Sequence, residues 1–116
     1  MNYLDMHVAN VKDGGVKAVA FEREVTLSSA GNSVWILVPD DVQQISVTVI
    51  PTSGASAKVQ TTIDPIAVVK SGAGITPVDW DAGLITETTQ DVASPITAFR
   101  LVQSGAGNTK MTARAQ

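Results

Sequence analysis

The sequence predicts an all-β fold, an antiparallel two-sheet β-sandwich that is jelly-roll-like, with about eight short strands and an extended N-terminal arm. Val, Ile and Thr recur along the chain, and their branched Cβ atoms suit a pleated strand better than a helix. Several segments alternate apolar and polar residues, as half-buried strands do. Turn-forming residues separate these segments at about the 8- to 12-residue spacing of a sandwich.

The first two predicted strands differ in pattern. Residues 18–27 place Val19, Phe21, Val25 and Leu27 on one face. Arg23 interrupts that face, so we expect it at a rim or beside a partner. Residues 34–38 (VWILV) form a continuous apolar run, which is typical of a strand covered on both faces.

The middle of the chain predicts two further strands. Residues 45–50 (ISVTVI) alternate, and PTSGAS supplies a loop before residues 57–63 (AKVQTTI). In this second strand we expect Val59 and Ile63 to point inward and Lys58 to point outward.

One short helix is predicted in DPIAVVKSG, with Asp64 as N-cap, Pro65 at the first helical position and Gly72 just past the end. The remaining predicted strands are residues 75–80, 84–88, 96–102 and 109–115.

The N-terminal residues do not follow the strand pattern. We therefore divide the chain into an arm, residues 1–17, and a β-sandwich domain, residues 18–116. Such an arm is either disordered or ordered by adding an edge strand to another chain. Apolar side chains are costly to leave in water, which favours contact with a partner. The arm residues assigned to this contact are Tyr3, Leu4, Met6 and Val8.

Composition excludes several classes of protein. A chain of 116 residues fits one domain. It is 44% hydrophobic but 16% charged with a net charge of −3, so we expect no nucleic-acid partner, which needs clustered Lys and Arg. The absence of cysteine excludes disulfides and thiolate metal sites. No secretory signal and no long apolar run is present, so we expect no membrane association and synthesis in a cytoplasm.

The segment VDWDAG is the strongest candidate for chemistry. A calcium loop starting at Asp79 would place Asp81 correctly at position 3, but Gly83 falls one place early and Gln90 occupies the position of the bidentate glutamate. We therefore expect no metal and interpret the segment as a strand end with a turn. Asp79, Trp80 and Asp81 remain candidates for contact with a partner.

Catalytic and cofactor sites are not expected. Asp40 with Asp41, or Asp79 with Asp81, has no spacing that defines an acid–base pair, and His7 is the only histidine. The two SGAG tetrapeptides lack the following GK[ST] of a phosphate loop and are interpreted as turns between strands. We therefore predict that the chain is not an enzyme.

A family resemblance covers residues 30–116. The order is a polar loop, a strand ISVTVIP, the turn W-x-x-G, a strand ITAFRLV and a final strand near the C-terminus. It resembles small virion proteins of tailed bacteriophages, such as capsid decoration, cement or staple proteins. The residues that match are Pro51, Trp80, Gly83, Pro95, Ala98 and Arg100, and each is interpreted as a determinant of the fold.

The resemblance implies a structural protein on the outer head surface of the virion. Its expected partners are the major capsid protein and itself, as a homo-dimer or homo-trimer. Some similar chains belong to tails or fibres, so the alternative is a tail- or fibre-associated module that recognises a surface glycan. In that alternative, the exposed ring of Trp80 would provide the flat apolar surface that a sugar needs.

Overall fold

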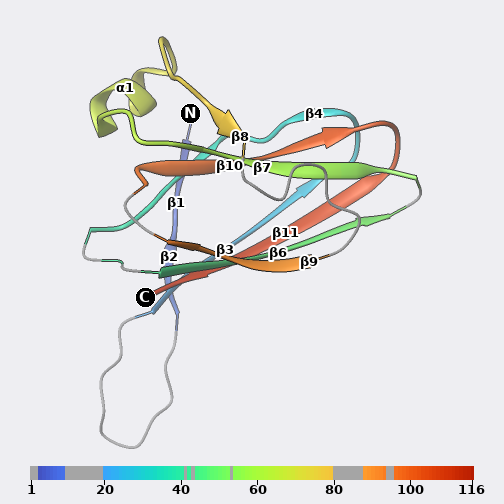
Figure 1. Ribbon diagram of the computed structural model, residues 1–116, viewed down its shortest axis with the longest axis horizontal. Coiled ribbons are helices and arrows are strands. Elements are labelled where there is room, and N and C mark those ends of the chain that lie inside the picture. Colours follow the sequence, from blue (N-terminus) through green and yellow to red (C-terminus); the bar gives the residue numbers. More distant parts are fainter. Residues whose placement is uncertain are drawn as a thin grey trace, which may run out of the picture.

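The computed structural model describes residues 3–9, 20–40, 42, 44–52, 54–79, 88–93 and 96–116. Within these ranges the chain forms eleven strands and one short helix. The strands pair into two sheets, which Figure 1 shows as two layers facing each other. The predicted all-β sandwich is confirmed, although its strands are more numerous and some are shorter than expected.

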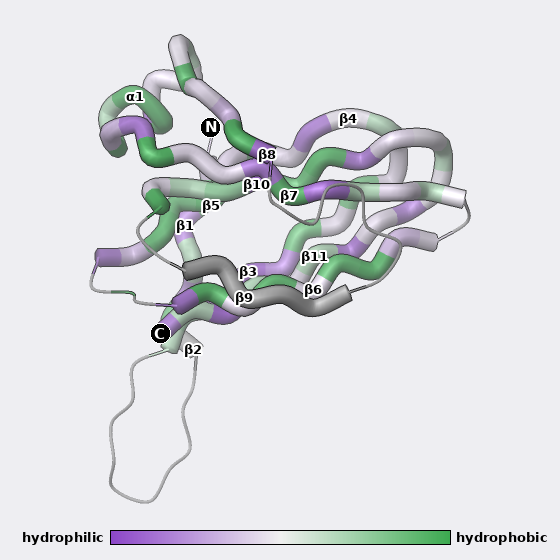
Figure 2. Tube along the Cα trace, in the orientation of Figure 1, coloured by the Kyte–Doolittle hydropathy of each residue, from purple (hydrophilic) through white to green (hydrophobic). Residues whose placement is uncertain are grey.

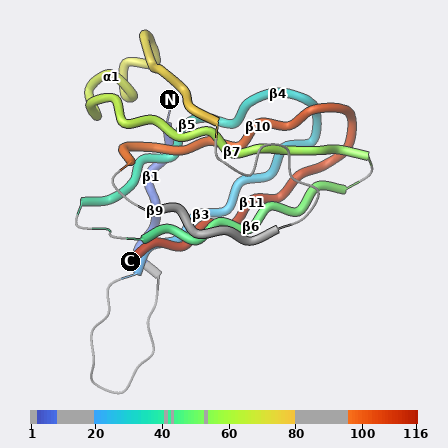
Figure 3. Tube along the Cα trace, viewed as in Figure 1, coloured from blue at the N-terminus to red at the C-terminus, as the bar shows by residue number. Residues whose placement is uncertain are grey.

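The strands of sheet A, in spatial order, are β1 (Tyr3–Asp5), β5 (Trp35–Leu37), β10 (Ala98–Ser104), β7 (Ser56–Thr62) and β8 (Val78–Asp79), with β4 (Gly31–Asn32) also pairing with β10. The strands of sheet B, in spatial order, are β2 (His7–Ala9), β3 (Ala20–Leu27), β11 (Asn108–Ala115), β6 (Gln44–Thr52) and β9 (Thr88–Ala93). Every pair is antiparallel except β1 with β5, which is parallel. Figure 3 shows β10 and β11, the last two strands, lying in opposite sheets.

The main hydrophobic core fills the space between the sheets. Alternate residues of β6 and β11 point into it, and Figure 2 shows hydrophobic and hydrophilic residues alternating along these strands. On β3 the predicted apolar face is half-buried against the core, whereas the opposite face is exposed. The fully buried core side chains include Ile36, Ile45, Val47, Val49, Val59, Phe99, Leu101 and Met111.

A second, smaller cluster lies on the outer face of sheet A. Trp35 and Leu37 point away from the main core and pack with Ala98 and with Val69 of helix α1 (Ile66–Ser71). Figure 1 shows α1 lying over one end of sheet A. The prediction that the VWILV strand is covered on both faces is therefore confirmed.

The helix begins and ends close to where the sequence predicts. Gly72 ends it in the left-handed conformation, with φ of 73°, which glycine adopts without steric cost. The predicted N-cap is wrong: Pro65 holds that position without a side-chain hydrogen bond. Asp64 Oδ2 instead accepts a hydrogen bond from Thr76 N at 2.6 Å, which ties the two ends of the helical connection together.

The predicted inward position of Ile63 is also wrong. Strand β7 ends at Thr62, so the alternation of the pleat does not extend to the next residue. Ile63 is 76% exposed, whereas Thr62 is buried. The predicted strand over residues 84–88 lies almost wholly outside the described residues.

Residues 3–9, which the sequence assigns to an arm, lie in the two sheets of this chain. Tyr3–Asp5 pairs with β5 in sheet A, and His7–Ala9 pairs with β3 in sheet B. Met6 lies between these strands and is buried in the main core. The N-terminal segment therefore passes from one sheet to the other at their common edge. The proposed boundary after residue 17 falls outside the described part of the chain.

Candidate functional site

A row of five side chains crosses the outer face of sheet A from one edge to the other. Its members come from five different strands, and neighbouring members are register partners or are in contact. In spatial order they are Tyr3, Trp35, Arg100, Gln60 and Asp79. We call this set the sheet A row. It contains two of the residues that the sequence identified as candidates for partner contact, one at each end.

Asp79 is held by two neighbours on β7. Gln60 Nε2 donates to its Oδ1 at 2.9 Å, and Lys58 Nζ donates to its Oδ2 at 3.0 Å. The hydrogen bond from Gln60, followed by that from Lys58, lowers the pKa of Asp79 below its ordinary value of 3.8. Both carboxylate oxygens are therefore engaged within the chain.

Arg100 occupies the centre of the row. Its Nε donates to Gln60 Oε1 at 2.9 Å, and its guanidinium carbon lies 4.6 Å from the centroid of the Trp35 ring. Trp35 is only 5% exposed, so the ring is a fixed platform beneath the cation. Burial lowers the pKa of Arg100; arginine side chains nevertheless stay protonated in proteins.

Tyr3 forms the other end of the row. Its half-buried ring packs against the cluster under α1, and Lys70 Nζ of that helix lies 5.5 Å from the ring centroid. Of the other arm candidates, Leu4 packs against the main core and Met6 is buried in it. Val8 is 68% exposed. The arm candidates therefore separate into three packed side chains and one that faces solvent.

The loop candidates Trp80 and Asp81 lie outside the described residues, as does Gly83. Only Val78 and Asp79 of VDWDAG are described, as strand β8 at one edge of sheet A. The structure thus brings Asp79 into the sheet A row, and the predicted role of Trp80 in partner contact remains a prediction.

The outer face of sheet B has a different character. Exposed ion pairs join β3 and β11, with 3.4 Å between Lys110 Nζ and Glu24 Oε2 and 3.6 Å between Arg114 Nη1 and Glu22 Oε2. Exposed pairs of this kind contribute little to stability. Beside them run the hydroxyl side chains Ser46, Thr48 and Thr112 of β6 and β11.

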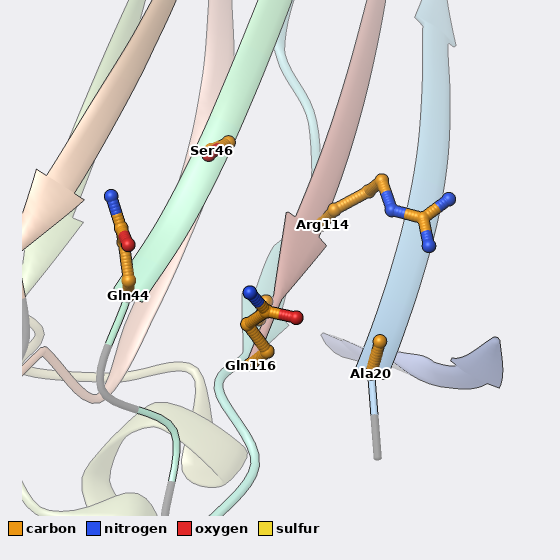
Figure 4. Close-up of a pocket in the computed structure, with 6 residues that line it drawn as sticks. Ala20, Gln44, Ser46, Arg114 and Gln116 are labelled. Carbon is orange, nitrogen blue, oxygen red and sulfur yellow. The ribbon is translucent and has the colours of Figure 1, made fainter. Parts of the chain in front are cut away.

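A hollow lies at one end of this face. It is lined by Ala20, Gln44, Ser46, Arg114 and Gln116, among others, and Figure 4 shows these side chains coming from three neighbouring strands and the residue after β11. The main chains of Gln44 and Gln116 exchange two hydrogen bonds of 3.0 Å. Beside two alanines, the lining carries two side-chain amides, one hydroxyl and one guanidinium, which can form hydrogen bonds with a ligand.

His7 also acquires a defined contact. Arg23 Nη1 lies 2.6 Å from His7 Nε2, and because arginine only donates, the imidazole nitrogen accepts. The predicted partner for Arg23 is therefore found on the edge strand β2. The described residues include no group of three or more His, Asp or Glu side chains arranged to hold a metal ion. No helix in the described part of the chain is both long and apolar enough to cross a bilayer.

Sequence reasoning missed the centre of the sheet A row. Arg100 was identified only as a determinant of the fold, and Trp35 only as part of the apolar run VWILV. The signal available was a charged residue between the buried Phe99 and Leu101, which places Arg100 on the outer face. Its neighbours on that face depend on strand order and register, which the sequence did not predict.

Comparison with known proteins shows the fold. No protein-family model matches the chain, and no curated protein matches it in sequence. The structure is similar to the SPBc2 prophage-derived protein YomS, with a TM-score of 0.57 and 10% identity over 88% of this chain and 98% of that chain. Peruvianin-I, a cysteine peptidase from Thevetia peruviana latex, matches at a TM-score of 0.38 with 12% identity, over 83% of this chain and 49% of that chain. The second likeness is too weak to support an argument, and the first shows that the chain shares the β-sandwich fold of YomS.

Proposed function

We propose that this chain is a non-enzymatic structural protein of a bacteriophage particle, which binds the major capsid protein on the outer head surface and stabilises or decorates the head. The observation that carries the proposal is the likeness to a prophage-derived protein over nearly the full length of both chains. A shared fold does not by itself imply a shared function. The surfaces of the molecule provide the supporting argument.

Both sheets present side chains suited to docking. The outer face of sheet B combines hydroxyl groups with ion pairs that are already formed within the chain. Such a face can exchange its water for hydrogen bonds with a partner without leaving an unpaired charge buried. The outer face of sheet A adds an ordered row of aromatic, amide and charged groups. These features support a binding role.

Edge strands support self-association and partner contact. Val8 lies on β2 at the edge of sheet B and is 68% exposed. An exposed edge strand can pair with a strand of another chain. Because Met6 is already buried in the same chain, we propose that Val8 and the outer edge of β2 make the contact that the sequence assigned to the arm.

Fractionation of the particle tests this proposal. Particles of the phage or induced prophage that encodes the chain are split into heads and tails, and the purified, labelled protein is sedimented with each fraction. We expect saturable binding to heads and higher heat resistance of decorated heads. Binding to tails alone would overturn head attachment, and binding to neither would overturn a virion role.

The tail or fibre alternative depends on Trp80. If the chain is such a module, Trp80→Ala should abolish glycan binding. If the chain binds heads and Trp80 is not part of the capsid contact, Trp80→Ala should leave head binding unchanged. A glycan array probed with the wild-type protein and this variant separates the two functions. Phe21→Leu is a matched control, because Phe21 packs against the main core.

A further inference from the structure

Among the described residues, the charges on the outer face of sheet A do not balance. Lys58 and Asp79 form an ion pair at 3.0 Å. Arg100, the next cation on the same face, takes part in none of the ion pairs formed by the described residues. The chain as a whole carries a net charge of −3, and the neighbouring cation Lys58 is already paired with Asp79.

The guanidinium of Arg100 is nevertheless held in place. The bond from Nε to Gln60 Oε1 fixes one edge of the group, and the Trp35 ring supports one face of it. Gln60 is itself oriented by its hydrogen bond to Asp79. Within the described part of the chain, the terminal nitrogens Nη1 and Nη2 donate no hydrogen bond. The structure thus positions a planar pair of donors that lacks an acceptor.

The surroundings define how a ligand would approach. On one side of Arg100 along β10, Ala98 lies beneath Val69 of α1. On the other side, Val102 is half-buried and pairs with Lys58. Helix α1 therefore covers one half of this face, and Arg100 lies at the border with the half that no described element covers.

A carboxylate matches this arrangement. Two parallel N–H groups of a guanidinium bind both oxygens of a carboxylate in one plane, and such pairs are stronger than neutral hydrogen bonds. Because the donors are already fixed, little conformational entropy is lost when they bind. We propose that Arg100, on the outer face of sheet A beside α1, is a docking site for a protein partner. The group that it binds is the carboxylate of an Asp or Glu side chain of that partner. A nucleic-acid backbone is disfavoured, because the sheet A row ends in Asp79 and the chain is acidic.

The identity of the partner as a particle protein rests on the proposed function, but the chemistry of the site can be tested without it. The ¹⁵N-labelled protein is titrated with sodium acetate, and the side-chain Nε–Hε signals of arginine are followed by NMR. The signal of Arg100, assigned by its loss in Arg100→Lys, should shift with acetate beyond its response to sodium chloride at equal ionic strength. Arg114, which already pairs with Glu22, is the internal control and should shift less.

Two results of the titration would overturn the site. One is an Arg100 response no larger than that of Arg114. The other is a response to inorganic phosphate but not to acetate, which would contradict the assignment to a carboxylate.

Head binding then tests the partner. Arg100→Lys keeps the positive charge but loses the planar pair of donors, so we expect head binding about tenfold weaker or more, because a charge-assisted bidentate contact is lost. Arg114→Lys keeps the positive charge opposite Glu22 and should weaken head binding less than Arg100→Lys does. Equal binding by both variants overturns the docking site and leaves the proposed function intact. Absence of head binding by the wild type overturns the proposed function, while the acetate titration still decides the chemistry of Arg100.

Discussion

Ser33 and Leu101 exchange two hydrogen bonds, one of which uses a side chain in place of the main chain. Ser33 N donates to Leu101 O at 2.8 Å, and Leu101 N donates to Ser33 Oγ at 2.9 Å. Strands β4 and β5 both pair with β10 and are separated by Ser33 and Val34. The serine hydroxyl therefore maintains the pairing with β10 across this interruption.

Removing this hydroxyl should destabilise the fold. Ser33→Ala leaves the buried Leu101 N–H without an acceptor, which costs about 1–3 kcal/mol of the free energy of unfolding. Urea denaturation measures the loss. Ser104→Ala, at an exposed position, is the control and should change stability by less than about 0.5 kcal/mol. Equal stability of the two variants would contradict the role of Ser33.

Replacing either of two buried threonines with valine should change the stability of the fold, in opposite directions at the two positions. Thr109 Oγ1 is buried and has no hydrogen-bond partner among the described residues, so Thr109→Val should stabilise the fold by about 1 kcal/mol, because a buried unpaired hydroxyl is removed. Thr62 Oγ1 accepts a hydrogen bond from Asp64 N at 3.2 Å. Thr62→Val should therefore destabilise the fold by about 1 kcal/mol. Thermal unfolding of both variants provides the comparison, and a shift of the same sign in both would refute it.

Asp79 should make stability depend on pH in the acid range. Its folded-state pKa lies below 3.8 because Gln60 and Lys58 bind the charged form. The contribution of the Asp79 carboxylate to the free energy of unfolding is therefore complete above pH 3.8. This contribution is lost as the pH falls through the lowered pKa. Asp79→Asn should remove this part of the pH dependence of stability. The free energies of unfolding of wild type and variant should therefore differ less at low pH than at neutral pH.

NMR titration of the carboxyl carbon tests the cause of this shift. Gln60→Ala and Lys58→Ala should each raise the pKa of Asp79 towards 3.8. Lys110→Ala removes a lysine whose partner is Glu24 and should leave the pKa of Asp79 unchanged. An unchanged pKa in all three variants would show that the two contacts do not persist in solution.

Local patterns predicted most of the sandwich because burial between two sheets imposes a period of two on each strand. The alternation in residues 45–50 and the continuous run in residues 34–38 were both interpreted correctly. Errors arose where a strand ends. Ile63 continues the apolar pattern by residue type, but β7 stops one residue earlier, and Asp64 uses its carboxylate for Thr76 instead of the helix.

The candidate site could be predicted only in part. Tyr3 and Asp79 were identified from residue type, but 76 positions separate them in the sequence. They belong to one row because β1 and β8 lie at opposite edges of the same sheet. Strand order depends on long-range pairing, which local alternation does not encode. For the same reason the contact between Arg100 and Trp35 was not predicted.

The N-terminal segment provides a direct test of whether residues 3–9 belong to the sandwich. Met6 is 7% exposed and packs in the main core, so Met6→Ala should lower the free energy of unfolding by about 2–5 kcal/mol. Val8, two residues away, is 68% exposed, and Val8→Ala should change it by less than about 0.5 kcal/mol. Urea denaturation of the isolated protein measures the stability of both variants. If Met6→Ala is as stable as wild type, the segment leaves the core in solution and is available as an arm for another chain. If the large loss is found, the outer edge of β2 is the part of residues 3–9 that remains open to a partner. Deletion of residues 3–9 would then unfold the sandwich and could not test binding.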